Sequence, residues 1–286
     1  MENMVNLSHF KNKKVFITGH TGFKGSWLSY LLDSSGAIVR GYALSPNTEP
    51  NLFSQLTYSN RFSSVNADIR DYDLLEKEVK NFKPNIIFNL AAQPIVLESY
   101  TEPKYTNEVN FNGTLNLLEV IRKNLTNSIS IFITTDKVYQ NLDKEINFKE
   151  DDRLGGIDPY SSSKAASELL INSYYKSFFI DTNNMVASAR AGNVIGGGDW
   201  SKYRLIPDII RSCFEDKILQ IRNPNSVRPW QHVLDPLFGY LALAEKLSNQ
   251  ESKYCSGWNF GPETHENTSV KEIIEIINHK GLKAKV

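Results

Sequence analysis

Two short polar runs carry residue types that can transfer protons. The first, Thr134-Thr135-Asp136-Lys137, follows the apolar, β-branched segment 129–133, which is typical of a buried parallel strand. In the second, Tyr160 and Lys164 stand four residues apart and share one face of a helix. A lysine ammonium favours a neighbouring phenolate, so we expect Lys164 to lower the pKa of Tyr160 from its reference of about 10 and make it a general base. The alternative is a surface tyrosine and lysine that share a helix face by chance.

A glycine-rich loop near the N-terminus favours the catalytic interpretation. The short apolar strand 15–18 leads into Gly19-His-Thr-Gly22-Phe-Lys-Gly25, and a helical apolar pattern follows over 26–32. Strand, glycine turn and helix in this order are the context of a phosphate-binding loop, because the backbone can approach a pyrophosphate at a helix N-terminus. The spacing Gly-x-x-Gly-x-x-Gly therefore favours dinucleotide binding over a plain tight turn. The candidate cofactor-binding residues of this loop are Gly19, Thr21, Gly22, Phe23 and Gly25.

Later strand ends supply further cofactor candidates. Asp68 follows the strand 64–67 and could accept a hydrogen bond from an adenine amine, whereas Asp71 could cap the next helix. Ala91 and Ala92 follow the strand that begins at residue 85, and their small side chains would let a cofactor lie against the backbone. The candidates from these segments are Asp68, Ile69, Leu90, Ala91, Ala92 and Asn110, together with Tyr160 and Lys164.

The choice between NAD and NADP stays open. The acid that usually binds a ribose 2′-hydroxyl is absent after the strand 37–42. Arg40 could hold a 2′-phosphate, but it precedes the end of the strand, which favours a solvated strand residue. We expect NAD as the cofactor, with NADP as the alternative.

The alternation of strands and helices predicts an α/β fold. The β-α pattern repeats from residue 15 to about residue 176, which indicates a Rossmann-type doubly wound parallel sheet. We expect residues 1–190 to form an NAD-binding domain and residues 191–286 mostly a smaller C-terminal substrate-binding lobe. The last strands and helices of the sheet would come from residues 230–262.

A stretch dense in Arg, Pro and aromatic residues lies in the second half of the chain. Arg222, Arg228 and Trp230 could clamp a diphosphate and stack on a base. A surface loop with a few exposed arginines explains the composition equally well, and the residues alone do not decide between these interpretations.

The overall composition excludes several classes of protein. The 286 residues are 41% hydrophobic and 22% charged, which is ordinary for a globular chain, and the formal net charge is zero. The charge gives no reason to expect a nucleic-acid or membrane partner. Cys213 and Cys255 are expected to be reduced, buried thiols, and the histidines show no metal-binding spacing. With neither a signal-peptide pattern nor a membrane span in the sequence, we expect a cytoplasmic location.

Six local motifs resemble those of the extended short-chain dehydrogenase/reductase superfamily, and within it the CDP-glucose 4,6-dehydratases. The motifs are Gly-His-Thr-Gly-Phe-Lys-Gly-Ser-Trp-Leu (19–28), Tyr-Ala-Leu-Ser-Pro with Pro-Asn-Leu-Phe (42–53), Thr-Thr-Asp-Lys-Val-Tyr (134–139), Asp-Pro-Tyr-Ser-Ser-Ser-Lys (158–164), Arg-Ala-Gly-Asn-Val-Ile-Gly-Gly-Gly-Asp-Trp (190–200) and Val-Arg-Pro-Trp-Gln-His-Val (227–233). The resemblance extends from Val15 to about Ile277. The dTDP-glucose dehydratases carry Thr-Asp-Glu where this chain has Thr135-Asp136-Lys137, and epimerases usually carry a Ser-rich segment there.

The resemblance implies an NAD-dependent hydro-lyase that converts CDP-glucose to CDP-4-keto-6-deoxyglucose, for the deoxysugars of O-antigen, lipopolysaccharide or other surface polysaccharides. It implies a homodimer through helices near 110–122 and 160–176. If burial lowers its pKa, Lys137 is the base at C5, with Asp136 as the acid; a mere ion pair is the alternative. The implied catalytic residues are Thr135, Asp136, Lys137, Tyr160 and Lys164. The implied substrate-binding residues are Gln93, Asn193, Arg204, Arg222, Arg228 and Trp230.

The sequence leaves three points open: the completeness of the substrate lobe, the exact reaction, and whether the protein is an enzyme. The substrate lobe of the family usually continues beyond the point where this sequence stops, so the chain is either a fragment or a protein with a trimmed lobe. Another nucleotide-sugar dehydratase or a 4-epimerase would share most of the motifs. A dinucleotide sensor without catalysis is the third alternative, although it would not need Thr135, Tyr160 and Lys164 together.

Overall fold

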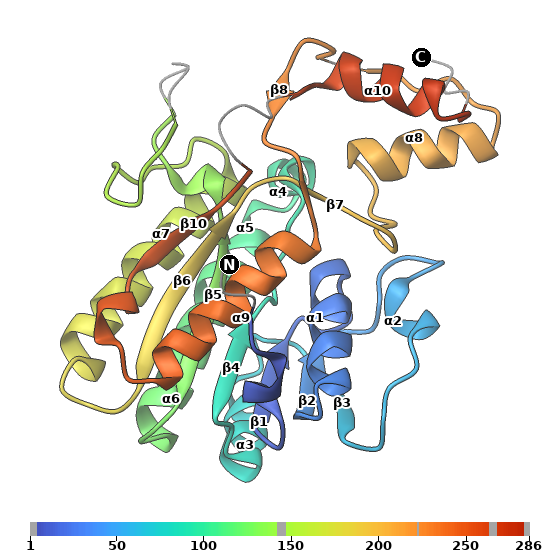
Figure 1. Cartoon of the computed structure of the whole chain (residues 1–286). Helices are drawn as coiled ribbons and strands as arrows, with labels where there is room; N and C mark the ends of the chain where they lie inside the picture. The colour runs from blue at the N-terminus through green and yellow to red at the C-terminus, as the bar shows by residue number, and fades with distance from the viewer. Residues whose placement is uncertain (1–4, 142–146, 222, 263–267, 283–286) are drawn as a thin grey trace.

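The computed structural model describes residues 5–141, 147–221, 223–262 and 268–282. Its centre is a 7-stranded parallel sheet in the order β3-β2-β1-β4-β5-β6-β10, which confirms the predicted Rossmann-type fold (Figure 1). The strands are β1 (Lys14–Thr18), β2 (Ile38–Ala43), β3 (Phe62–Asn66), β4 (Ile86–Asn89), β5 (Ile129–Thr135), β6 (Met185–Ala191) and β10 (Gly257–Phe260). The order reverses between β1 and β4, and a fold of this kind binds its ligands at that switch point, beyond the carboxyl ends of the strands.

Helices cover both faces of the sheet (Figure 1). The helices are α1 (Phe23–Ser34), α2 (Leu52–Gln55), α3 (Tyr72–Phe82), α4 (Val96–Thr101), α5 (Pro103–Asn107), α6 (Gly113–Asn124), α7 (Pro159–Tyr174), α8 (Leu205–Phe214), α9 (Leu234–Ser248) and α10 (Val270–His279). The helix expected near residues 110–122 is regular α-helix only from Gly113, because a π-helical turn over Glu108–Asn112 precedes α6.

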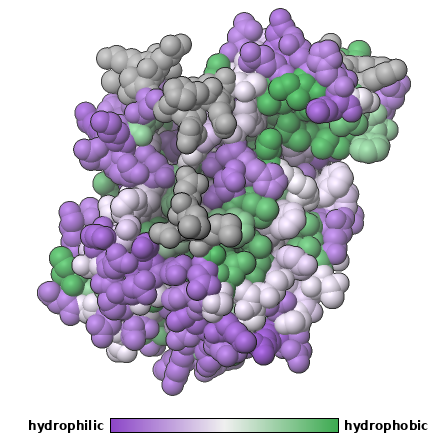
Figure 2. Space-filling view, in the orientation of Figure 1, coloured by the Kyte–Doolittle hydropathy of each residue, from purple (hydrophilic) through white to green (hydrophobic). Residues whose placement is uncertain are grey.

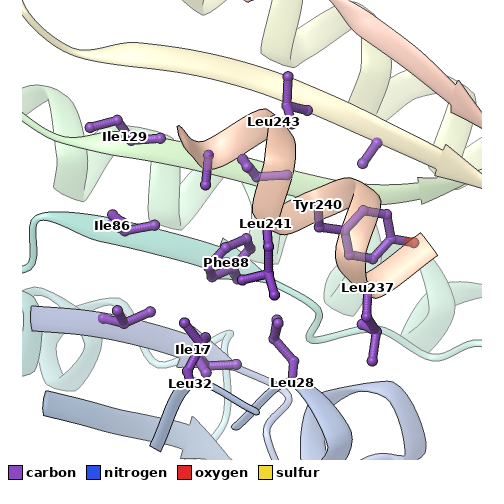
Figure 3. Packing of buried hydrophobic residues seen from close by; sticks show 14 of the residues in the cluster. Ile17, Leu28, Leu32, Ile86, Phe88, Ile129, Leu237, Tyr240, Leu241 and Leu243 are labelled. Carbon is purple, nitrogen blue, oxygen red and sulfur yellow. The ribbon is translucent and has the colours of Figure 1, made fainter. Parts of the chain in front are cut away.

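Alternate residues of each strand enter different cores, as the period of two dictates. Ile86 and Phe88 of β4 pack with Leu32 of α1 and Leu241 of α9, whereas Ile87 belongs to the core beneath α3, α6 and α7 (Figure 3). All of these side chains are fully buried. The near-continuous apolar runs of the central strands follow from this two-sided burial.

The chain leaves the sheet after β6 and returns to it through α9 and β10. In the first loop outside the sheet, β7 (Val194–Ile195) pairs with β9 (Gln231–His232). The ribbon of β8 (Val227–Arg228) and β11 (Thr268–Ser269) lies with α8 and α10 in a smaller lobe at one end of the sheet (Figure 1). On the face drawn in Figure 2, hydrophobic residues gather over this lobe, whereas the lower part of the face is mostly hydrophilic.

Two simple sequence expectations can be compared with the structure. Both cysteines are free, but each is half-buried rather than buried, because Cys213 lies on α8 of the small lobe and Cys255 precedes the edge strand β10. Among the described residues, no helix has both the length and the apolar character needed to cross a membrane.

A buried ion pair fastens α7 to the sheet. Glu168 accepts hydrogen bonds from Ser188 (2.7 Å), from Arg190 (2.7 Å) and from Thr134. The Arg190 guanidinium also donates to the hydroxyl of Tyr139 at 2.7 Å, and the side chains of Arg190 and Glu168 are only 7% and 3% exposed. This network orients the helix that carries Tyr160 and Lys164 against the end of β5.

We expect Arg190→Met to lower the free energy of unfolding by about 3 kcal/mol, because the change leaves the Glu168 carboxylate buried without its cation. Urea unfolding followed by circular dichroism measures the change. Lys217→Met is the control: Lys217 is 72% exposed and pairs with Glu215 at 2.7 Å on the surface after α8, so little change is expected. Equal losses in the two variants would contradict the prediction.

Candidate active site

The glycine-rich loop between β1 and α1 has the backbone geometry of an anion cradle. Gly19 has φ +71°, and a Cβ there would lie 2.6 Å from the backbone N of Ala91. A Cβ on Gly25 would lie 2.1 Å from the carbonyl oxygen of Gly19. Gly22 is the exposed N-cap residue of α1 and has no side chain to cover the helix N-terminus. The loop therefore offers the first-turn N–H groups and the positive end of the helix dipole to a phosphate.

The other predicted cofactor residues of this region lie around the same loop. The Thr21 hydroxyl donates to the Leu44 carbonyl at 2.8 Å and fixes the loop to the end of β2. The backbone N of Ala91 donates to the Thr18 hydroxyl at 3.1 Å, so the turn after β4 lies against the end of β1. Phe23, Leu90 and Ala92 are partly buried along this edge. These residues line the carboxyl edge of the sheet beside the glycine-rich loop, where a dinucleotide could bind.

The predicted adenine-binding residue Asp68 is held by an arginine. Arg70 donates to both carboxylate oxygens of Asp68, with Nη2 2.8 Å from Oδ2, and also contacts Glu108 at 3.1 Å. The hydrogen bonds from Arg70 lower the pKa of Asp68, so its carboxylate remains an acceptor. Ile69 is buried, and Asp71 caps α3 by accepting from the Leu74 N–H at 3.0 Å. Both proposed roles of these aspartates are therefore compatible.

Arg40 has a structural partner. Its guanidinium contacts Glu78 of α3 at 2.6 Å and lies over the ring of Phe82. The position in the middle of β2 agrees with a strand residue rather than with a ligand for a 2′-phosphate.

Asn110 and Gln93 make internal contacts that the sequence did not indicate. The Asn110 side chain accepts from the Gln93 N–H at 2.9 Å and donates to the Ser163 hydroxyl at 2.9 Å. The Gln93 amide donates to Thr106 at 2.8 Å, and its oxygen accepts from the Ile95 N–H at 2.6 Å. Both side chains are buried. In the structure they fix the turn after β4 to α5 and α7, and so act as supports for the site.

The predicted catalytic residues meet at the carboxyl end of β5. Thr135 is the last residue of the strand, and its hydroxyl donates to Asp136 at 3.1 Å. Lys137 contacts the same carboxylate at 3.1 Å, and these side chains are 39% and 35% exposed for Lys137 and Asp136. Tyr160 and Lys164, both buried, approach from the first turns of α7. Residues from two separate segments thus form one cluster beside the glycine-rich loop.

The pKa of Tyr160 differs from the sequence prediction. Burial raises it, and this effect exceeds the opposing charge of Lys137 and the hydrogen bond with Thr135, both of which lower it. The predicted lowering of this pKa by Lys164 was wrong. The Lys164 ammonium donates to the Ile133 carbonyl at 3.1 Å, and burial lowers its own pKa to about 8.

For Lys137 the sequence left two interpretations open: a base whose pKa is lowered by burial, and a mere ion pair with Asp136. Burial does act in that direction, but the charges of Asp136 and Tyr160 and the hydrogen bond to Asp136 outweigh it, so the pKa of Lys137 is raised. Lys137 is therefore an ammonium paired with Asp136 before any ligand binds.

Gln93, which was also predicted to bind substrate, makes the internal contacts described above. The other predicted substrate residues that the structure describes lie in the segments between β6 and α9. The side-chain oxygen of Asn193 is buried and has no hydrogen-bond partner in the described part of the chain, as expected of a ligand contact. Arg204 pairs with the buried Asp199 at 2.9 Å, and its charge acts on Tyr160. Arg228 is exposed and its charge acts on Lys137, while the Trp230 indole donates to the Thr268 carbonyl at 2.9 Å. Arg222 lies outside the described residues.

Two residues of this region were missed by the sequence analysis. Lys24, inside the glycine-rich loop, points its ammonium at the hydroxyl of Tyr240 on α9, at 3.4 Å. Burial lowers the pKa of Lys24 to about 7, and the charges of Arg204, Asp136, Lys164 and Lys137 act on it. A lysine between two loop glycines was the available signal, but its partner lies 216 residues away in sequence.

Comparison with known proteins identifies the family to which this chain belongs. The family model described as GDP-mannose 4,6 dehydratase matches residues 16–285. A CDP-glucose 4,6-dehydratase of Salmonella typhimurium is 45% identical over 277 residues, which cover 95% of this chain and 77% of that protein.

Solved structures show the same fold. The epimerase Mth375 of Methanothermobacter thermautotrophicus superposes with a TM-score of 0.86 at 25% identity, covering 98% of this chain and 81% of the other. A dTDP-glucose 4,6-dehydratase of Bacillus anthracis, solved in complex with NAD, gives 0.78 at 25% identity and covers 95% and 82%. The chain belongs to the GDP-mannose 4,6 dehydratase family, and the predicted place in the extended short-chain dehydrogenase/reductase superfamily is confirmed.

Proposed function

We propose that this protein converts CDP-glucose to CDP-4-keto-6-deoxyglucose and water, with NAD as a bound hydride carrier. The observation that carries the proposal is the cluster of Thr135, Asp136, Lys137 and Tyr160 at the end of β5 beside the glycine-rich loop. The CDP-glucose substrate is inferred from the similarity to the Salmonella dehydratase, and the product would serve deoxysugar biosynthesis.

The residues of the loop fit a nicotinamide dinucleotide. Gly19 and Gly25 occupy positions that a Cβ would obstruct, and the exposed Gly22 leaves the N-terminus of α1 open to a pyrophosphate. Asp68 would bind the adenine amine at the far end of the cofactor, held in place by Arg70. When bound, NAD would accept the C4 hydride of the sugar and later return it to C6. NADP remains the alternative at the ribose.

In the first half of the cycle, Tyr160 would take the proton of the C4 hydroxyl as the hydride leaves C4. Burial disfavours the phenolate, whereas Lys137 and the hydrogen bond with Thr135 favour it. A positively charged nicotinamide brought close to Tyr160 would favour the phenolate further. Through its hydrogen bond to the Ile133 carbonyl, Lys164 would hold the first turns of α7 against the end of β5.

In the second half, the C4 ketone acidifies the C5 proton, and the Lys137–Asp136 pair would remove water. Proton transfer along their 3.1 Å hydrogen bond converts ammonium and carboxylate into a neutral amine and a neutral acid. Exclusion of water by the substrate favours this neutral pair, because the ion pair loses its solvation. The Lys137 amine would then take the C5 proton, and Asp136 would protonate the departing C6 hydroxyl. After the hydride reaches C6, Lys137 returns a proton to C5, and the Tyr160 proton restores Asp136.

The nucleotide sugar would lie beneath the small lobe. Asn193 offers an unpaired oxygen, Arg204 and Arg228 offer charges for a diphosphate, and Trp230 offers a surface for a base. Arg222 belongs to the proposal on sequence grounds alone.

Incubation with CDP-glucose and NAD⁺ in deuterated water tests the proposed function. We expect loss of one water from the sugar, deuterium at C5 by NMR, and no net formation of NADH. Parallel incubations with dTDP-glucose, UDP-glucose and GDP-mannose test the nucleotide. Epimerised product without loss of water would support the epimerase alternative, and tight NAD⁺ binding with all four sugars unchanged would support a sensor.

We also propose a homodimer through the outer faces of α6 and α7. Leu169 of α7 is 61% exposed, and Phe178 and Ile180 just beyond it are 48% and 55% exposed, so a partner could bury apolar surface there. Light scattering after size exclusion measures the mass.

We also propose a cytoplasmic location, because the two cysteines are free and are not paired with each other.

A further inference from the structure

Lys24 is a charged residue at an unusual place. It is the second residue of α1, directly between Phe23 and Gly25 in the loop that would carry the dinucleotide. Its ammonium lies 3.4 Å from the hydroxyl of Tyr240 and 5.9 Å from the centre of that ring. Tyr240 is fully buried, and burial together with the charge of Tyr160 raises the pKa of its phenol, so the partner of Lys24 is a neutral hydroxyl.

The charges around Lys24 do not balance it. Arg204, at the start of α8, Lys164 of α7 and Lys137 after β5 all disfavour its ammonium, and Asp136 favours it. Asp136 is already engaged with Lys137 at 3.1 Å. The carboxylate of Asp199 is likewise engaged with Arg204 at 2.9 Å. An ammonium held among cations whose carboxylates are engaged is stabilised when an anionic ligand enters.

The position in the loop identifies which anion this is. Lys24 lies in the same first helical turn that presents its N–H groups beyond Gly22, where a diphosphate would bind. Arg204, the N-cap residue of α8, and Arg228 of β8 belong instead to the small lobe, on the side proposed for the substrate.

We propose that Lys24 binds the diphosphate of the nicotinamide dinucleotide and takes up a proton when the dinucleotide binds. The inference rests on the proposed function, because it requires this loop to be the cofactor site. The other contacts of this loop with a diphosphate would be backbone N–H groups and uncharged side chains. Lys24 would make the binding of the dinucleotide depend on pH.

The sign of the pH dependence follows from the groups that face Lys24. In the structure, burial and the neighbouring cations lower the pKa of Lys24 to about 7. A bound diphosphate raises this pKa, so binding of the dinucleotide near pH 7 takes up protons. Dinucleotide affinity is therefore expected to fall as the pH rises above 7. Lys164, with a pKa lowered to about 8 by burial, is mostly protonated at pH 7 and contributes little there. Tyr240, whose pKa is raised, remains neutral. A proton that Tyr160 releases as the nicotinamide approaches is released equally by the parent protein and by Lys24→Met, so the difference in uptake between them isolates Lys24.

Isothermal titration calorimetry of NAD⁺ at pH 7, in two buffers of different protonation enthalpy that contain no phosphate, measures both affinity and proton uptake. Lys24→Met keeps the length of the side chain but removes the charge, and we expect about tenfold weaker binding at pH 6.5 and loss of the uptake at pH 7. Lys24→Arg keeps a charge that does not titrate, so affinity should become independent of pH and the uptake should disappear. Lys77→Met, at an exposed position of α3, should behave as the parent protein.

The outcomes separate the inference from the proposed function. If Lys24→Met binds NAD⁺ with unchanged affinity and unchanged proton uptake, the inference is wrong and the proposed function stands. If the same variant loses affinity for CDP but not for NAD⁺, the ammonium serves the substrate, and the assignment to the cofactor is overturned. If the parent protein does not bind NAD⁺, both fail. Lys24→Arg keeps the charge of the side chain, and the loss of proton uptake expected for it tests the inference even if Lys24→Met has a folding defect.

Discussion

Tyr160→Phe is expected to lower kcat about a thousandfold, because the change removes the group that would take the C4 hydroxyl proton. Affinities for NAD⁺ and CDP-glucose should stay within about threefold, since the ring remains in its buried place. Steady-state assay of the 4-keto product gives kcat, and calorimetry gives the affinities. Tyr174→Phe is the matched control: Tyr174 lies on the same helix, and its hydroxyl bonds to Glu119 at 2.8 Å, far from the cluster. Equal activity of the two variants would rule out Tyr160 as the base.

The pH profile supplies a second readout of the same residue. Because the Thr135 hydrogen bond lowers the pKa of Tyr160, Thr135→Val should move the acidic limb of kcat/KM to higher pH. Activity would then be lost progressively as the pH falls through this raised pKa, and partly recovered in alkali. An unchanged profile would mean that a group other than Tyr160 limits the reaction.

Lys137→Met is expected to lower the rate of water loss about a thousandfold, because it removes the proposed base at C5. Oxidation at C4 should persist. Stopped-flow absorbance at 340 nm should therefore show reduced nicotinamide that forms in the first turnover and stays, because the hydride cannot return to C6. The accumulation should be easier to see at higher pH, since Lys137 also lowers the pKa of Tyr160.

Lys104→Met controls for the loss of a lysine, because Lys104 is 89% exposed and makes only a surface pair with Glu108 at 3.6 Å. Its kinetics should match those of the parent protein. If Lys137→Met forms dehydrated product at the parent rate, the Lys137–Asp136 contact is a simple ion pair.

The sequence predicted most of the fold because the relevant signals are local. Apolar β-branched runs place the strands, and the glycine spacing places the phosphate loop. Within this loop, a Cβ on Gly25 would meet the carbonyl oxygen of Gly19. The spacing of Tyr160 and Lys164 likewise predicted their shared helical face. The approach of Thr135, Asp136 and Lys137 to that face follows from the order of the parallel strands.

What the sequence could not give depends on partners that are distant in the chain. The pKa directions of Tyr160 and Lys137 depend on burial and on all the surrounding charges. The predicted influence of Lys164 on Tyr160 was therefore wrong, and the lowered pKa that the sequence left open for Lys137 is not found. The contact of Lys24 with Tyr240 requires α9 to return to the sheet. The supporting role of Asn110 depends on Gln93 and Ser163 meeting it in space.

Transfer of the C4 hydrogen within one sugar tests the central claim most directly. The measurement is mass spectrometry and NMR of the product formed from an equal mixture of two substrates. One is CDP-glucose deuterated at C4, and the other is CDP-glucose that carries carbon-13 in the sugar ring and no deuterium. The account requires deuterium at C6 of the product that lacks carbon-13, and none in the carbon-13 product, because the bound cofactor returns each hydride to the molecule that gave it. Product in which the C4 deuterium is retained at C4, lost to water or distributed over both sugars would contradict internal hydride transfer.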